Sequence, residues 1–331
     1  MTPYVAGIQP VESGWIKLNT NENPYPPSPN VIESLKSADF SRLRLYPDSD
    51  SGILRRAVAE NLGLTEDNVF CGNGSDEVLA LAFATFFAGK PDILMPDVSY
   101  GFYEVWSAMY DAGRMEVPLR GLKVCPEDYK GGKGVVIANP NAPTGNALTL
   151  PEVEQIVRSN PDGVVIVDEA YIDFADAESA VGLIGKFDNL LVVRTFSKAY
   201  SLAGLRAGFA AGHKYLIDGL RRVKNAFNSY PLDMLAQTAA AAAIRDTAYW
   251  DKTRKEITKT RETLRAALDA PPSQANFLFW RPPDAKKMYE YLLENKILVR
   301  YWDKPKINGY LRITIGTNEQ TEELIRCVKR F

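Results

Sequence analysis

The chain has 331 residues, of which 46% are hydrophobic and 24% charged, and this is the composition of an ordinary globular protein with a substantial core. Its formal net charge of −2 argues against a nucleic-acid partner. Three widely spaced cysteines and a single histidine, His213, exclude a disulfide framework and a metal site built from several histidines. The most apolar window, residues 78–89, is too short to cross a bilayer, so we expect no metal, no membrane contact and a cytoplasmic protein.

The first 30 residues are rich in proline and asparagine, which argues against a helix or a central strand in much of this segment. A disordered tail is one interpretation of such a composition. The side chains of Tyr4, Trp15 and Leu18 favour instead an ordered arm that packs on another part of the protein. Short helices are expected next, over residues 31–37 and 52–61.

Apolar runs and helical segments then alternate along the chain. The expected strands cover residues 69–71, 92–95, 114–117, 135–138, 164–167 and 190–193, and the helices between them cover residues 77–87, 102–110 and 150–159. Strands separated by helices predict a mainly parallel sheet with helices on both faces. A further helix is expected over residues 214–223. The C-terminal part predicts a smaller α+β domain, with helices over residues 232–245 and 251–268 and strands over residues 276–280, 297–300 and 310–315.

Polar groups follow several of these strands directly. Lys198 comes shortly after one strand, Asp168 ends another, and the run of Gly74, Ser75 and Asp76 opens the helix after the first. Because the carboxyl ends of strands in an open parallel sheet meet at one crevice, these groups can lie together. Burial there lowers the pKa of a lysine and makes its amine nucleophilic enough to form a Schiff base. Any single lysine is more often an ordinary surface residue, so the hypothesis depends on the whole set.

Together these groups match the needs of pyridoxal phosphate, and we expect this cofactor. Lys198 would bind its aldehyde, and Asp168 would keep its pyridine nitrogen protonated. The phosphate needs backbone N–H groups at the start of a helix, a hydroxyl group and a fixed positive charge. The chain offers these in Gly74, Ser75 and Asp76, together with Ser197 and Arg206.

The motifs that carry these residues extend over almost the whole chain. They are residues 18–24, 46–48, 72–77, 100–103, 139–145, 168–171, 197–198 with Arg206, and 311–316. In this set and order the sequence resembles the fold-type I, class II aminotransferases that use pyridoxal phosphate, and most closely their histidinol-phosphate aminotransferase branch. The resemblance implies an α/β fold with a mainly parallel seven-stranded sheet sandwiched by helices, plus a smaller α+β domain. It divides the chain into an arm over the active site (1–30), a large cofactor-binding domain (31–225) and a small C-terminal domain (226–331).

Further cofactor contacts follow from the resemblance. Tyr100 is expected to stack on the pyridine ring, and Tyr171 to contact the phenolic oxygen of the cofactor and take part in catalysis. Many relatives also contact that oxygen with an asparagine directly before Pro-Thr-Gly, but this chain has Ala142 there. Either Asn141 takes over the contact or Tyr171 carries it alone. Tyr46 is expected to reach the cofactor phosphate of a partner subunit, which implies a homodimer with a shared active site.

The resemblance also implies the reaction. Lys198 and Asp168 are the expected catalytic groups of a transaminase that moves the amino group of L-histidinol phosphate to 2-oxoglutarate in histidine biosynthesis. The substrates are small anionic molecules, and Arg312, Arg300 and Asn21 are the residues expected to bind them. A surface ion pair is the commoner fate of an arginine at a strand edge, but guanidinium groups suit carboxylate and phosphate equally well.

Other functions stay open at this stage. An aromatic amino-acid aminotransferase and a threonine-phosphate decarboxylase share the same lysine, aspartate and phosphate-binding groups. The reaction type depends on which substrate bond stands perpendicular to the cofactor ring, and the sequence does not show this. A non-catalytic cofactor-binding module, such as the sensing half of a regulator, would need a DNA-binding extension that the first 30 residues do not offer. A nucleotide-binding loop at residues 72–74 lacks the further glycine of such motifs.

Overall fold

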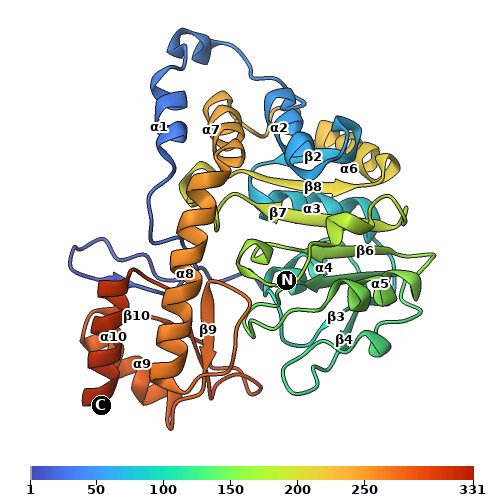
Figure 1. Ribbon diagram of the computed structural model, residues 1–331. Coiled ribbons are helices and arrows are strands. Elements are labelled where there is room, and N and C mark those ends of the chain that lie inside the picture. Colours follow the sequence, from blue (N-terminus) through green and yellow to red (C-terminus); the bar gives the residue numbers. More distant parts are fainter. Residues whose placement is uncertain (1) are drawn as a thin grey trace.

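The computed structural model describes residues 2–331, with one large sheet and a smaller domain beside it (Figure 1). The strands of the large sheet lie in the order β2-β8-β7-β6-β5-β3-β4. Their bounds are β2 Val69–Gly72, β3 Ile93–Pro96, β4 Arg114–Val117, β5 Gly134–Ala138, β6 Val164–Asp168, β7 Leu190–Thr195 and β8 Gly208–Gly212. Neighbours from β4 to β7 are parallel, and β8 is antiparallel to both β7 and β2. The predicted mainly parallel sheet of seven strands is confirmed.

The three central strands, β5, β6 and β7, are buried along almost their whole length. They are nearly continuous runs of valine, isoleucine and leucine, the pattern of parallel strands covered on both faces. The register pairs Ala138 with Asp168, and Asp168 with Val193, so β5 and β6 end level and β7 extends two residues further. The polar groups that follow these strands are therefore held at one rigid edge.

Helices cover both faces of the sheet, as the alternating sequence pattern predicts (Figure 1). One layer consists of α3 (Gly74–Phe86), α4 (Phe102–Met109) and α6 (Lys214–Phe227), and the opposite layer contains α5 (Leu150–Arg158). Successive residues of a strand point to opposite layers: Val136 packs in the first layer and Val135 in the second. No helix within residues 2–331 is both long and apolar enough to span a membrane.

The smaller domain contains two short sheets. One has the strand order β11 (Arg300–Tyr301), β12 (Leu311–Thr314) and β9 (Phe277–Trp280), and the other pairs β1 (Ile16–Lys17) with β10 (Ile297–Leu298). Its helices are α8 (Thr247–Leu268), α9 (Ala285–Glu294) and α10 (Asn318–Arg330). Because β1 belongs to the N-terminal arm, the arm completes this domain, and the expected packing of the arm on another part of the protein is seen here.

One predicted strand is two strands in the structure. The sequence predicts a single strand over residues 297–300, but β10 pairs with the N-terminal arm whereas β11 pairs with β12. Val299 lies between them and is 1% exposed. A continuous apolar run does not show that its two halves pair with different sheets. The break at Val299 could therefore not be predicted from the sequence.

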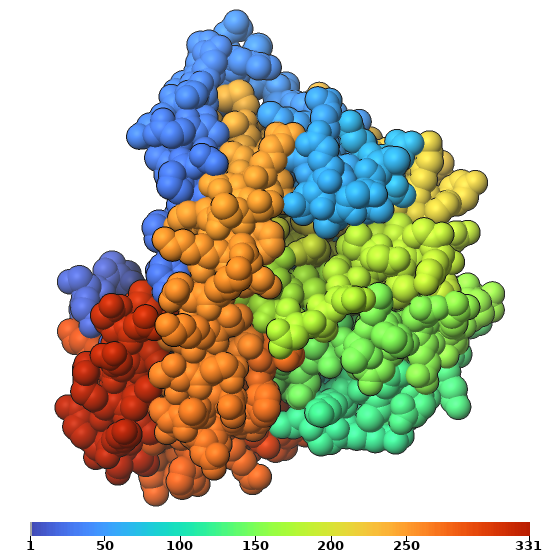
Figure 2. Space-filling model, viewed as in Figure 1, coloured from blue at the N-terminus to red at the C-terminus, as the bar shows by residue number. Residues whose placement is uncertain are grey.

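The helices α1 (Pro29–Lys36), α2 (Gly52–Leu62) and α7 (Met234–Arg245) form a separate group at one end of the molecule. Here α7 packs on both α1 and α2. Figure 2 shows α1 and the short 3-10 helix that follows it, in blue, projecting from the body at this end. Since α7 lies C-terminal to the expected boundary at residue 225 but packs on the N-terminal part, the division into three segments stays a prediction.

Candidate active site

Lys198 lies just past the end of β7, at the edge where the central strands stop. Its side chain is mostly buried, and Nζ donates a hydrogen bond of 3.1 Å to the backbone carbonyl of Thr20. Burial, and next the positive charge of Arg312, lower the pKa of the Lys198 amine to about 8. Roughly a tenth of this amine is therefore neutral and nucleophilic at pH 7, which is far more than for an ordinary lysine.

Asp168 is the last residue of β6, and its carboxylate is buried with no cationic partner among residues 2–331. Oδ2 accepts a hydrogen bond of 2.8 Å from the Tyr103 hydroxyl, and Oδ1 accepts one of 3.1 Å from the backbone N–H of Ala170. Burial raises the pKa of Asp168 to about 6 despite these bonds. A buried carboxylate with neutral donors only is well suited to bind a protonated ring nitrogen.

The start of α3 is brought very close to Arg206. Gly74 has a φ of +84°, and a Cβ there would lie 2.7 Å from Nη2 of Arg206. A Cβ on Gly208 would lie only 2.4 Å from the backbone nitrogen of Ser75. Nη2 of Arg206 also donates a hydrogen bond of 3.2 Å to Oδ2 of Asp76. The two glycines thus bring the first N–H groups of a 13-residue helix and a guanidinium together, which is a typical phosphate site.

A cavity of about 300 Å³ joins these groups. It is lined by most of the residues that the sequence predicts for cofactor binding, namely Ser75, Asp76, Tyr100, Asp168, Tyr171, Ser197, Lys198 and Arg206. The cavity therefore presents an amine, a buried acid, aromatic side chains and an anion cradle at one place. These residues fit pyridoxal phosphate, because Asp168 suits its cationic nitrogen and the glycine cradle suits its phosphate.

Two tyrosines of the cavity are fixed by hydrogen bonds. The Tyr100 hydroxyl donates to Oδ1 of Asp76 at 2.8 Å, which ties the aromatic ring to the phosphate cradle. The Tyr171 hydroxyl accepts a bond of 2.9 Å from Nδ2 of Asn21, and the Tyr171 ring centroid lies 5.8 Å from Nζ of Lys198. Asn21 itself is buried and lines neither this cavity nor the larger one described below. The structure thus places Asn21 behind Tyr171 instead of in the substrate space.

The position of Asn141 also differs from one of the sequence-based alternatives. Its Oδ1 accepts a hydrogen bond from the Ser99 hydroxyl at 2.7 Å, and its Nδ2 donates to the Val98 carbonyl and the Thr144 hydroxyl, both at 3.1 Å. The whole amide is therefore engaged inside the protein, and it is Ala142 that lines the cavity. This geometry leaves Tyr171 as the residue that faces the cavity.

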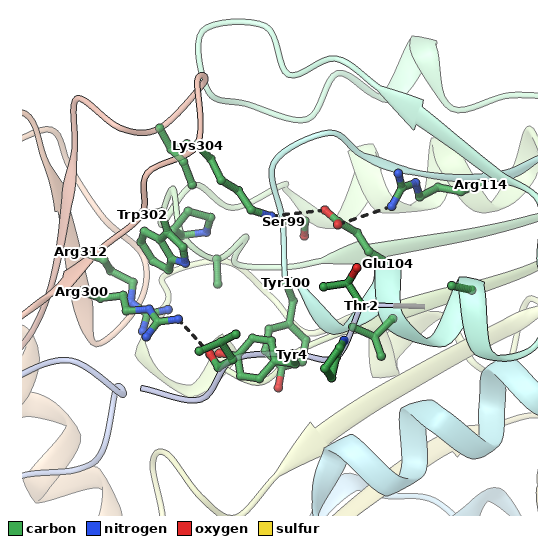
Figure 3. Close-up of a pocket in the computed structure, with 18 residues that line it drawn as sticks. Thr2, Tyr4, Ser99, Tyr100, Glu104, Arg114, Arg300, Trp302, Lys304 and Arg312 are labelled. Atoms are coloured by element: carbon green, nitrogen blue, oxygen red, sulfur yellow. Dashed lines mark hydrogen bonds and ion pairs between the residues drawn. The ribbon is translucent and has the colours of Figure 1, made fainter. Parts of the chain in front are cut away.

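A second, larger cavity of about 530 Å³ adjoins the first, with which it shares Tyr100 and Ala142 (Figure 3). Arg312 and Arg300 lie on one side of it. Nη2 of Arg312 donates to the Asn19 carbonyl at 2.8 Å, and its buried Nε has no partner among the described residues. The Arg300 guanidinium donates to the backbone carbonyl of Val5 at 3.1 Å. Both predicted anion-binding arginines therefore face the space next to the lysine.

The beginning of the N-terminal arm lies over both cavities. Tyr4 lines the larger cavity and stacks on Phe102 with ring centroids 4.3 Å apart, and Gln9 lines the smaller one. Nδ2 of Asn19 donates to the Ile8 carbonyl at 2.8 Å and so fixes the course of the arm. The sequence predicts an arm over the active site, and the lining of both cavities agrees with that role.

Three residues near the lysine and the aspartate were missed by the sequence analysis. Tyr103 binds Asp168, Thr20 accepts from Lys198, and Asn23 donates from Nδ2 to the Lys198 carbonyl at 3.0 Å. All three lie inside quoted motifs, residues 18–24 and 100–103. The motifs could have drawn attention to these three residues. Only the fold shows which members of a motif lie next to Lys198 or Asp168.

Tyr46 does not line either cavity of its own chain. It is 82% exposed and stacks on Tyr230 with ring centroids 4.7 Å apart, at the end of the molecule where α1 projects. The predicted contact with the phosphate of a partner subunit stays a prediction. Within residues 2–331, no three His, Cys, Asp or Glu side chains are grouped so that they could hold a metal ion.

The chain is similar in sequence to known proteins over almost its whole length. The chain is 50% identical over 343 residues to a histidinol-phosphate aminotransferase 1 from Bordetella parapertussis, covering 100% of this chain and 96% of that protein. It is also 50% identical over 337 residues to a histidinol-phosphate aminotransferase 1 from Hydrogenovibrio crunogenus, covering 99% of this chain and 94% of the relative.

A solved structure shows the same fold. It is the histidinol-phosphate aminotransferase from Sinorhizobium meliloti in complex with pyridoxal-5'-phosphate, with a TM-score of 0.86 and 22% identity over 95% of this chain and 91% of that one. The resemblance inferred from the motifs is thus confirmed. A sequence model of the family described as aminotransferase class I and II matches residues 13–328, and the chain therefore belongs to that family.

Proposed function

We propose that this chain is a transaminase that uses pyridoxal phosphate to move an amino group between L-histidinol phosphate and 2-oxoglutarate. The products would be imidazole acetol phosphate and L-glutamate, in histidine biosynthesis. Relatives of that name at 50% identity over almost the full length support the choice of substrate. The observation that carries the proposal is the joint lining of one cavity by Lys198 and Asp168, directly beside a cavity lined by Arg300 and Arg312.

The residues of the smaller cavity would hold the cofactor. When bound, pyridoxal phosphate supplies an aldehyde for amines and a ring that withdraws electrons from the substrate carbon. Asp168 would bind the ring nitrogen, and a cation there favours the ionised form of this carboxylate. Tyr100 would cover the ring and Tyr171 would contact its phenolic oxygen. The phosphate would bind to Gly74, Ser75, Asp76, Ser197 and Arg206.

Lys198 performs the proton transfer in this proposal. Its Nζ would take the proton from the carbon that carries the substrate amino group. The lowered pKa of about 8 leaves a useful share of the amine neutral at pH 7, as a base requires. The hydrogen bond to the Thr20 carbonyl keeps this amine at the end of β7, next to the cavity.

The arginines of the larger cavity would bind the anionic ends of the substrates. Histidinol phosphate carries a phosphate and no carboxylate, whereas glutamate carries two carboxylates, and a guanidinium group binds both kinds of anion through paired N–H donors. Arg312 lies 5.2 Å and Arg300 5.4 Å from the Trp302 ring centroid, which holds both planar groups beside one aromatic face. Arg312 is the stronger candidate because its buried Nε lacks a partner among residues 2–331.

We also infer a homodimer that pairs at the projecting end. Phe40, Leu43 and Tyr46 are at least half exposed there, and Ile53 and Tyr230 are only slightly less so. Large apolar side chains gathered on one surface are typical of a subunit interface. Tyr46 would cross this interface to the phosphate site of the partner. Light scattering should give twice the monomer mass, and Tyr46→Phe should weaken cofactor retention without changing that mass.

An assay with defined donors tests the proposed reaction. The purified protein is loaded with pyridoxal phosphate and mixed with L-histidinol phosphate and 2-oxoglutarate, and glutamate formation is measured. Phenylalanine as donor and threonine phosphate, with CO2 release as the readout, test the two rival activities. We expect glutamate from histidinol phosphate at a kcat/KM at least tenfold above that for phenylalanine, and no CO2. If the cofactor binds but only a rival substrate reacts, the substrate assignment is wrong while the family stands.

A further inference from the structure

The proposed amine donor has three branches at the carbon that carries its amino group, and the inference drawn below rests on that proposed function. The amine must reach Lys198 in the smaller cavity, and the phosphate arm suits Arg300 and Arg312 in the larger one. The third branch ends in an imidazole ring. It needs a place in the larger cavity away from the two arginines.

Glu104 lies at such a place. It belongs to the first turn of α4, and Figure 3 shows it across the cavity from Arg300 and Arg312. It is the one acidic side chain among the described residues that line this cavity, whose other charged members are Arg114, Arg300, Lys304 and Arg312. In so basic a cavity, a lone carboxylate favours a ring with N–H donors over a purely anionic group.

The carboxylate of Glu104 has hydrogen-bonding capacity to spare. Its ion pairs are long, 3.5 Å from Oε2 to Nη1 of Arg114 and 3.8 Å from Oε1 to Nζ of Lys304. Neither oxygen accepts a hydrogen bond from any residue between 2 and 331. An ionised carboxylate offers about four acceptor positions, and the Glu104 side chain is 45% exposed at the cavity rim, so most of these positions remain free.

We propose that Glu104 binds the imidazole ring of the amine donor through an N–H···O hydrogen bond, and that this contact selects an imidazole-bearing donor over one with a benzene ring. A neutral imidazole has one N–H donor and a protonated imidazole has two, whereas a phenyl ring has none. Glu104 is thus a specificity-determining residue that touches the substrate and takes no part in the proton transfer.

The test compares three donors on two forms of the loaded enzyme. Wild type and Glu104→Gln are each assayed with L-histidinol phosphate, L-phenylalanine and L-glutamate. We expect the kcat/KM of the variant for histidinol phosphate to fall about tenfold, because the amide oxygen of glutamine still accepts a hydrogen bond but lacks the negative charge that strengthens it. The values for phenylalanine and glutamate should stay within about twofold, because neither donor has a ring N–H.

Glu116→Gln is the matched control. Glu116 lies on β4 and pairs with the same Arg114 at 3.3 Å, but it does not line the cavity. The same chemical change at Glu116 therefore disturbs Arg114 without removing a carboxylate from the substrate space. We expect this variant to keep the donor preference of the wild type. Thermal melts and cofactor absorbance check that both variants are folded and loaded.

The outcomes separate a substrate-binding role of Glu104 from a purely structural role of its ion pairs. An equal loss for all three donors in Glu104→Gln would overturn the inference. The same selective loss in Glu116→Gln would also overturn it. Either result would mean that Glu104 acts only through its ion pairs, which stabilise the structure around the cavity. An unchanged donor preference in Glu104→Gln would overturn it while leaving the proposed function intact. If the wild type itself turns over phenylalanine but not histidinol phosphate, the proposed function fails, and the inference fails with it.

Discussion

Two buried lysines occupy different regions of this protein and show what makes one of them reactive. Lys198 follows β7 at the edge of the large sheet, and its amine has one hydrogen-bond partner, the Thr20 carbonyl. Lys224 lies on α6, is 2% exposed, and donates to the carbonyls of Ser49 at 2.7 Å and Ser229 at 3.2 Å. Burial is the largest cause that lowers the pKa of both amines. Burial alone therefore does not identify the catalytic lysine.

The difference between the two regions lies in what surrounds the amine. Lys224 also has the Asp50 carboxylate at 3.9 Å, so its charge and most of its donors are satisfied by fixed protein groups. Its task is to hold the loop that follows Tyr46. Lys198 instead lines a cavity with Asp168 and an anion cradle, and two of its three donor positions are left for a ligand. Open hydrogen-bonding positions at a cavity, more than a shifted pKa, mark the reactive lysine.

The largest expected effect is that of replacing the reactive lysine. Lys198→Ala removes both the group that holds the cofactor aldehyde and the proposed base, so kcat should fall at least about 10³-fold. The cofactor-free variant should melt close to the temperature of the cofactor-free wild type, because the Lys198 amine has only one hydrogen-bond partner in the protein, the Thr20 carbonyl. Steady-state assays and thermal melts measure the two quantities. Activity within tenfold of wild type would remove Lys198 from the mechanism.

Asp168→Asn is expected to come next. The amide keeps the shape of the side chain but cannot carry the negative charge that stabilises a cationic ring nitrogen, so kcat should fall about 10²-fold or more. Cofactor affinity should also decrease, which titration with pyridoxal phosphate measures. Asp173, which pairs with the buried Arg194, offers a matched control, since Asp173→Asn should affect stability and not cofactor affinity. Equal cofactor affinity in wild type and Asp168→Asn would contradict the assigned role.

Lys224→Met tests the other side of the comparison. Methionine keeps the apolar stem but leaves the carbonyls of Ser49 and Ser229 without their donor, at a cost of about 2 kcal/mol in the free energy of unfolding. Urea denaturation of the loaded protein measures this loss. The kcat of the folded fraction should change less than about tenfold, because Lys224 lines neither cavity. A loss of kcat as large as that of Lys198→Ala would erase the distinction between the two lysines.

The sequence predicted the large sheet better than the contacts around it. Continuous apolar runs such as residues 164–167 can hardly be anything but buried strands, and a lysine and an aspartate at strand ends are brought together by the parallel topology alone. Lys198, Asp168 and Arg206 therefore line one cavity as expected. The break at Val299 was not predictable, because hydrophobicity does not show which partner strand each half selects.

Contacts between distant segments were also out of reach of the sequence. Asn21 and Asn141 both lie in the right motifs, but the side chain of each is turned to protein partners and not to a cavity. Lys224 was not singled out at all, since nothing local marks a lysine whose partners, Ser49 and Ser229, are loop carbonyls. Which way a polar side chain points is decided by long-range packing, and that information is spread over many residues.

The smallest expected effect concerns the proton of Lys198 itself. In the cofactor-free protein its pKa is about 8, below the value of about 10.4 for a lysine in an unfolded chain. Between these two values the unfolded chain holds the proton and the folded protein has largely lost it, so stability rises with pH in this window. Lys198→Met lacks the titration, whereas Lys224 is present in both proteins and cancels. The free energy of unfolding of the wild type, relative to this variant, should therefore increase by about 1 kcal/mol per pH unit near pH 9. Urea titrations of both cofactor-free proteins at about pH 8.5 and 9.5 measure the difference, and a flat or falling difference would contradict a lowered pKa for the Lys198 amine.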